Sequence, residues 1–179
     1  MRLIRRTPAA IVVTVSLSAA GMAIVAKSGA ISAQTPSGRQ SPAGGDFHAT
    51  LANVYAAQLE LQNGRPAAFK ASWSHADDIT LSGGFGGTVE KGWTQISQRL
   101  DWVGAQFSNG TNKIERIVAN SSGDLGYVVQ LEHIRFNVPG QATPSTRDYR
   151  VTMLFRREAN AWKIIHRQAD SQMTKAAPQ

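Results

Sequence analysis

The segment RVTMLFRREANAWKIIHRQAD, Arg150 to Asp170, alternates apolar and polar side chains in two runs that are joined by a short link. A period of two residues is typical of β-strands, because successive side chains of a strand point to opposite faces of the sheet. One face of the second run carries Trp162, Ile164, His166, Gln168 and Asp170. Consecutive strands with a short link predict an antiparallel pair at the C-terminal end of the domain.

The same pattern continues towards the N-terminus, where NKIERIVANS and DLGYVVQLEHIRFNV also have the composition of strands. Two further faces follow from the alternation. The first face carries Tyr149, Val151, Met153 and Phe155, and the second carries Tyr127, Val129, Leu131 and His133. We expect these faces to line a cone that is apolar at depth and polar near one rim.

Before the strands, the apolar residues recur every three or four positions, which indicates amphipathic helices. The first predicted helix runs from a possible N-cap at Asp46 to a stop at Asn63-Gly64, the second covers Arg65 to Trp73, and the third lies within EKGWTQISQRLDWVGAQF. A strand, DDITLSG, separates the last two helices. The apolar positions of the helices are Phe47, Leu51, Val54, Tyr55 and Leu59 in the first and Trp93, Ile96, Leu100, Val103 and Phe107 in the third. All four tryptophans, Trp73, Trp93, Trp102 and Trp162, are predicted to pack in the core. Helices followed by a meander of strands favour an α+β domain with the helices on one face of a bent sheet.

The N-terminal segment has the pattern of a secretory leader, since Arg2, Arg5 and Arg6 precede a long apolar run and then small residues. We therefore expect a leader over 1–33, a flexible tether over 34–45, one domain over 46–171 and a tail over 172–179. The expected location is periplasmic or extracellular. A leader that is retained would instead anchor the chain in the membrane.

The charge of the chain is concentrated in this leader. The net charge of +7 includes four basic and no acidic residues up to Lys27, so the rest of the chain carries +3. The arginines near the C-terminus alternate with apolar residues, as on the solvated face of a strand, and we expect no nucleic-acid partner. The chain contains no cysteine, which excludes a disulfide framework.

The stretch WSHADDITLSGGFGG, Trp73 to Gly87, raises two further possibilities. Its glycines lack the spacing of a phosphate-binding loop and do not lead directly into a helix, so we predict a flexible turn beside the cavity. His75, Asp77 and Asp78 are residue types that bind metals. Neighbouring side chains of an extended segment diverge, however, and we predict hydrogen bonding within a turn and no metal site.

These segments together resemble the SnoaL-like branch of the nuclear transport factor 2-like superfamily, which has relatives similar to ketosteroid isomerase. The resemblance rests on the glycine-rich stretch, the helix that begins EKGW, the strand GDLGYVVQLE and the segment Arg150 to Asp170. It implies a cone-shaped α+β domain in which three N-terminal helices pack on a strongly curved, mainly antiparallel sheet. It also implies a homodimer that pairs through the sheet. Members of this superfamily include isomerases, polyketide cyclases, hydrolase-like proteins and proteins that only bind.

From these features we expect an exported domain that binds a small apolar or amphipathic molecule in a cone-shaped pocket, without a cofactor. Two alternatives remain open: an isomerase or cyclase that moves a proton next to a carbonyl, and a dimeric interaction module with a filled core. The residues expected to line the pocket are Trp73, His75, Tyr127, Tyr149, His166 and Asp170. His166, His75 and Asp170 are the catalytic candidates. His166 and Asp170 lie roughly 13 Å apart along one strand, so they cannot form a direct acid–base pair.

Overall fold

The computed structural model describes residues 46–175. The predicted leader and tether lie outside this range, as do the last residues of the predicted tail. Within it, the elements follow the order α1 (Phe47–Leu61), α2 (Ala67–Ala71), β1 (Thr80–Ser82), β2 (Glu90–Lys91), α3 (Gly92–Gly104), β3 (Ser108–Ser122), β4 (Leu125–Asn137), β5 (Ser145–Glu158) and β6 (Ala161–Asp170). None of the described helices is long and apolar enough to span a bilayer.

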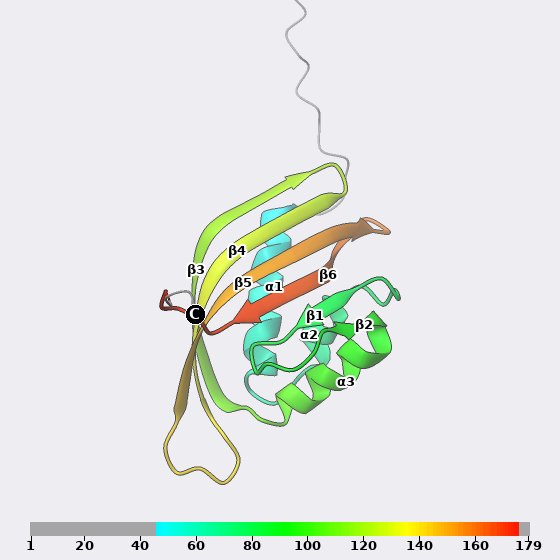
Figure 1. The fold of residues 1–179 in the computed structure, drawn as a ribbon. Coiled ribbons are helices and arrows are strands. Elements are labelled where there is room, and N and C mark those ends of the chain that lie inside the picture. Colours follow the sequence, from blue (N-terminus) through cyan, green and yellow to red (C-terminus); the bar gives the residue numbers. More distant parts are fainter. Residues whose placement is uncertain (1–45, 176–179) are drawn as a thin grey trace, which may run out of the picture. The chain divides into compact units, whose positions relative to one another are not determined.

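The strands form one curved sheet in the order β2-β1-β6-β5-β4-β3 (Figure 1). Neighbouring strands are antiparallel, except that β1 runs parallel to β6. The helices cover the concave face, and the core fills the space between the two layers. The predicted α+β class and the mainly antiparallel curved sheet are confirmed.

The first helix begins and ends where its sequence signals predict. The Asp46 carboxylate accepts a hydrogen bond from the backbone N–H of His48 at 3.0 Å, as an N-cap residue does. The helix ends at Leu61, and Gly64 follows with a φ of 79°, a conformation that glycine adopts without strain. One part of the predicted apolar stripe is wrong, because Leu59 is 36% exposed whereas Gln58 is buried.

The third helix also follows the prediction in outline, with Ile96 and Leu100 buried against the sheet. The prediction for Trp102 is wrong, since this side chain is 47% exposed. It packs at the edge of the core, where the Arg99 guanidinium lies 4.6 Å from its ring centroid and Phe85 meets it edge-on. A cation over its face lets a large ring remain partly in solvent.

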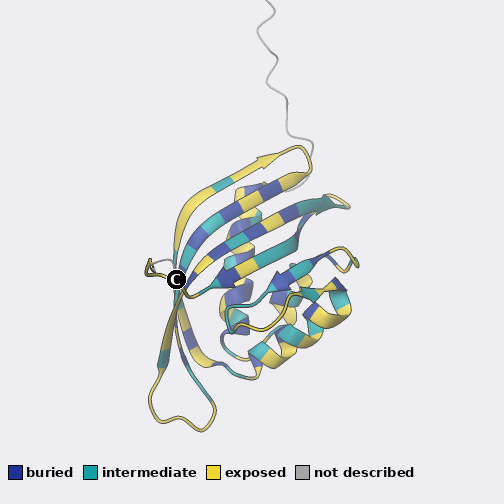
Figure 2. Cartoon of the chain, in the orientation of Figure 1, coloured by how far each residue is buried: buried dark blue, intermediate teal, exposed yellow. Residues whose placement is uncertain are grey.

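The alternation of β4 is inverted relative to the predicted cone lining. Val128, Gln130, Glu132, Ile134 and Phe136 are buried under the helices. Tyr127 is instead 38% exposed on the outer face of the sheet. Figure 2 shows the buried and exposed residues alternating along β4 and β5. The alternation shows which side chains share a face of the sheet. Because both faces of β4 carry apolar residues, the alternation alone does not show which face is buried.

A β-bulge in β6 moves its last residues to the opposite faces. Phe155 pairs with Ile164, but Leu154 pairs with His166, so Ile165 is an extra residue. After the bulge, Arg167 and Ala169 face the helices beside Met153 and Val151. His166, Gln168 and Asp170 therefore share the outer face with Leu154, which corrects the single face predicted for Trp162 to Asp170.

Candidate functional site

A cavity of about 70 Å³ lies between the helices and the concave face of the sheet. Its apolar wall consists of Leu61, Phe69, Leu81, Phe85, Leu100, Val103, Phe107, Ile134 and Ala169. Its polar wall consists of Gln58, Gln62, Arg99, Glu132, Tyr149 and Arg167. At roughly 10–15 Å³ for one water molecule, the cavity has room for a ligand of roughly five to seven heavy atoms.

A buried carboxylate lies at the centre of the polar wall. Glu132 is 1% exposed, and its Oε2 atom accepts hydrogen bonds from Gln58 Nε2 at 2.6 Å and from Arg167 at 2.7 Å. Its Oε1 atom accepts one from Gln130 Nε2 at 2.7 Å, and Gln130 Oε1 accepts one from the Tyr55 hydroxyl at 2.8 Å. The chain of hydrogen bonds links α1, β4 and β6, and it holds the Glu132 carboxylate in one orientation.

Three buried polar atoms of residues on the cavity wall lack a close hydrogen-bond partner among the described residues. These atoms are Tyr149 Oη, Gln58 Oε1 and Arg99 Nε, although the Arg147 guanidinium is near enough to donate to Tyr149 Oη. Burial raises the pKa of Tyr149 above its usual value, although the positive charges of Arg147 and Arg167 oppose this shift. The Tyr149 hydroxyl is therefore protonated at neutral pH and can donate a hydrogen bond to a bound molecule.

The glycine-rich loop closes the cavity next to Tyr149. Gly84 lies so close to the ring that a Cβ atom at this position would be 2.8 Å from Tyr149 Cζ. Phe85 lines the cavity, packs against Phe107 and Phe136, and has the Arg147 guanidinium 4.9 Å from its ring centroid. The loop is thus part of the wall of the cavity, in agreement with the predicted turn beside it.

Of the six residues that the sequence suggests for the pocket lining, Tyr149 lies on the wall of this cavity, and the other five lie elsewhere. Trp73 is buried in the core, where it meets Phe69 edge-on. Tyr127 and Asp170 lie on the outer face of the sheet, where Asp170 pairs with Arg150 at 2.6 Å. The structure therefore does not bring these six residues together around one pocket.

The two candidate histidines also lie away from the cavity. His166 Nδ1 is 2.7 Å from the Thr80 hydroxyl, and burial lowers the pKa of His166. His75 is exposed at the surface and stacks on Trp93 with 3.8 Å between the ring centroids. Neither histidine lies beside Glu132 or Tyr149 on the cavity wall.

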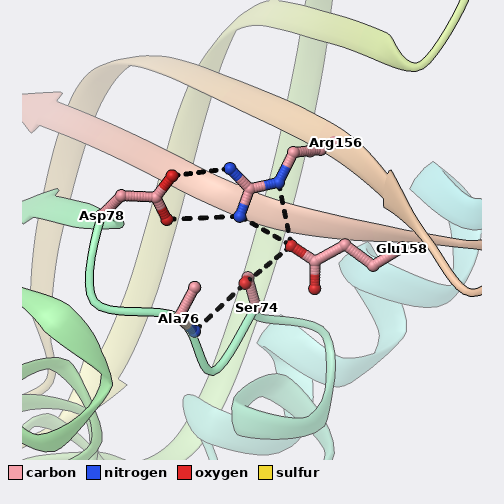
Figure 3. A network of polar contacts seen from close by, with 5 residues as sticks. All are labelled: Ser74, Ala76, Asp78, Arg156 and Glu158. Atoms are coloured by element: carbon pink, nitrogen blue, oxygen red, sulfur yellow. Dashed lines mark hydrogen bonds and ion pairs between the residues drawn. The ribbon is translucent and has the colours of Figure 1, made fainter.

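The segment that follows Trp73 is held by an ion-pair network (Figure 3). Arg156 donates to both oxygens of Asp78, at 2.7 and 3.2 Å, and also to Glu158 at 2.8 Å. Ser74 donates to the same Glu158 oxygen at 2.8 Å and accepts from the backbone N–H of Ala76. The Arg156 guanidinium lowers the pKa of Asp78. This carboxylate therefore fastens the loop to β5, and Ser74, which the prediction did not name, adds a hydrogen bond within the segment.

The functional residues that sequence reasoning misses are polar residues at core positions. Gln58 occupies the helical position between Val54 and Leu61, both of which are buried. Gln130 and Glu132 interrupt the buried series of β4 in the same way. A polar side chain in a position that the periodicity assigns to the core is the signal that could have identified them. Arg167 carries no such signal, because the bulge at Ile165 places it inside.

Comparison with known proteins agrees with this architecture. The SnoaL-like domain family matches residues 48–173. A comparison with curated protein sequences finds no match. Among solved structures, a nuclear transport factor 2-like superfamily protein from Salmonella enterica has a TM-score of 0.62 at 15% identity, over 72% of this chain and 93% of that one.

Two further solved structures share the fold. A putative scytalone dehydratase from Novosphingobium aromaticivorans has a TM-score of 0.61 at 13% identity, over 74% of this chain and 88% of that one. A ketosteroid isomerase-like protein from Erwinia carotovora has a TM-score of 0.56 at 17% identity, over 72% of this chain and 100% of that one. At these identities the similarity establishes the fold alone. With the family match over most of its length, the chain belongs to the SnoaL-like domain family.

Proposed function

We propose that the domain, carried on an exported chain, binds a small and mostly apolar molecule in the cavity beneath α1 and α3. The observation that carries this proposal is the presence of buried polar atoms without a close partner, Tyr149 Oη, Gln58 Oε1 and Arg99 Nε, beside the apolar wall of the cavity. A buried polar atom without a partner costs about 1–3 kcal/mol. A ligand with complementary polar atoms recovers that cost, and its apolar part is removed from water.

Binding is favoured over proton-transfer catalysis by the arrangement around Glu132. A general base needs a lone pair directed at the proton it removes, and three donors already take three of the roughly four acceptor positions of the Glu132 carboxylate. His166 and Asp170 share the outer face of the sheet after the bulge. The described cavity wall thus combines a hydrogen-bond donor with an apolar lining, which suits a binding site.

Substitution of one lining residue tests the binding proposal. Benzene, as a small apolar probe, is expected to shift the NMR signals of residues around the cavity. Leu100 lies on the wall and is 3% exposed, so Leu100→Phe fills the space and should lower benzene affinity by roughly ten-fold or more, at a stability cost of about 1–3 kcal/mol. Leu154→Phe is the matched control, because Leu154 is 40% exposed and does not line the cavity. If benzene leaves the wall signals unchanged, the cavity is closed to ligands and the proposal is wrong.

We also propose that two copies of the chain pair through the outer face of the sheet. This face exposes apolar side chains on neighbouring strands, namely Ile117, Val118, Leu125, Tyr127 and Leu154. Tyr127 and Leu154 are direct cross-strand partners, so their side chains form one continuous surface. Contiguous apolar patches of this kind are typical of protein interfaces.

Sedimentation equilibrium at micromolar concentration tests the dimer. The unmodified chain is expected to sediment as a dimer, and Leu154→Asp as a monomer, because a charge would be buried without a partner in the interface. Val89→Asp is the control, since Val89 is 57% exposed and belongs to the loop before β2. A monomer at this concentration for the unmodified chain would contradict the proposal.

A further inference from the structure

The cavity is surrounded by more positive than negative groups. Arg99 and Arg167 line the wall, and Arg147 lies over the Phe85 ring. Against these three guanidinium groups stand the carboxylates of Glu132 and of Glu90, which is 3.6 Å from Arg99 Nε. The excess of one positive charge favours a ligand that carries a negative charge.

The negative charge of Glu132 does not oppose such a ligand strongly. Its two oxygens accept hydrogen bonds from Gln58, Gln130 and Arg167. Hydrogen bonds to a charged group are stronger than those between neutral groups, so the Glu132 carboxylate interacts mainly with these three donors. The guanidinium of Arg167 therefore compensates Glu132, and Glu90 lies against Arg99. The surplus positive charge is that of the exposed Arg147, which lies over the Phe85 ring on the Arg99 side of the cavity.

Two buried donors lie on that side of the cavity. Arg99 Nε makes no hydrogen bond to a described protein atom, and the Glu90 carboxylate stays 3.6 Å from it. The Tyr149 hydroxyl donates to no described protein atom, so its proton remains available even where Arg147 donates to its oxygen. Both donors lie against consecutive glycines, since a Cβ atom on Gly83 would be 3.4 Å from Arg99 Nε and one on Gly84 would be 2.8 Å from Tyr149 Cζ. The raised pKa of Tyr149 keeps its hydroxyl protonated, so both groups donate at neutral pH.

We infer that the ligand is a small monocarboxylate, whose carboxylate accepts hydrogen bonds from Tyr149 Oη and Arg99 Nε. This inference rests on the proposed binding function. A guanidinium and a hydroxyl are donors that suit a carboxylate, and the surplus positive charge offsets the cost of taking the anion out of water. The hydrocarbon part of the ligand then contacts Leu61, Leu100 and Val103 on the apolar wall. The small volume restricts this part to a short chain or a single ring.

Three ligands of nearly equal size and shape test how the charge of the ligand affects binding. Butyrate, butyramide and 1-butanol are titrated into the full chain at neutral pH and constant ionic strength, and the shifts of wall signals are followed by NMR. We expect butyrate to bind at least about ten-fold more tightly than butyramide, because its hydrogen bonds to Arg99 and Tyr149 are charge-assisted. Tyr149→Phe should weaken butyrate binding by roughly ten-fold, and Arg99→Met should remove the preference for butyrate over butyramide.

Arg150→Met is the matched control. Arg150 is a 55% exposed side chain that pairs with Asp170 on the outer face, so its loss should leave butyrate affinity unchanged. An equal loss in Arg150→Met and Arg99→Met would mean that butyrate binds through general surface charge, which would overturn the inference. Equal affinity for butyrate and butyramide would also overturn it and leave the binding function intact. Binding of benzene without binding of butyrate or butyramide would overturn the inference as well. If benzene fails as well, the proposed function itself is wrong.

Discussion

Arg167→Met is expected to lower the free energy of unfolding by about 3–5 kcal/mol, because it leaves the Glu132 carboxylate buried without its cationic partner. The carboxylate is 1% exposed and the Arg167 side chain 11% exposed, so water replaces the lost hydrogen bond poorly. Gln58 and Gln130 still donate to Glu132, but they are neutral and cannot offset its charge. Urea unfolding measures the change as a lower midpoint with an unchanged slope.

The double variant Glu132→Gln/Arg167→Met gives the decisive comparison. The double variant leaves no unpaired charge at this site. It should therefore be more stable than Arg167→Met alone, although both variants lack the Arg167–Glu132 ion pair. Arg150→Met serves as the control for the loss of a guanidinium, because its pair with Asp170 is exposed and should contribute less than about 1 kcal/mol. A double variant less stable than Arg167→Met would show that the stability of this region does not depend on charge balance.

The elements of the fold follow from local sequence signals, and the structure confirms them where those signals are strong. Asp46 caps α1 and Gly64 follows its end, as predicted, and the alternating runs form β3 to β6. Such features depend on a few neighbouring residues. The short strand β2 (Glu90–Lys91) escapes prediction because two residues carry no periodicity.

The cavity wall could be predicted less well, because it depends on which face of each strand is buried. Tyr149 belongs to an inner face that the alternation of β5 (Ser145–Glu158) marks clearly, because this face is apolar and the outer face, apart from Leu154, is mostly polar. For β4, both faces carry apolar residues, and the inner face was identified only by the contacts of Gln130 and Glu132 with α1. The bulge at Ile165 exchanged His166 for Arg167, and nothing in the alternation of that strand marks it.

Gly84→Ala is expected to destabilise the domain by about 1–3 kcal/mol, because the new methyl group would overlap the ring of Tyr149. A Cβ atom there would lie 2.8 Å from Tyr149 Cζ, and the ring is buried with only 5% of its surface exposed. Either the ring or the loop must move, and both belong to the cavity wall. We therefore expect butyrate affinity to fall together with stability, as measured by thermal unfolding and by titration.

Gly83→Ala is the matched control, since it makes the same change one residue earlier. Its Cβ atom would meet the end of the Arg99 side chain at 3.3 Å, a contact that a shift of a few tenths of an ångström relieves. Replacing glycine by alanine also restricts the unfolded chain, which by itself stabilises a protein by about 0.4–1 kcal/mol where the backbone permits it. Gly83→Ala should thus be close to neutral. If the overlap with Tyr149 is the cause, Gly84→Ala should cost much less in a Tyr149→Ala background, and an equal cost in both backgrounds would contradict the explanation.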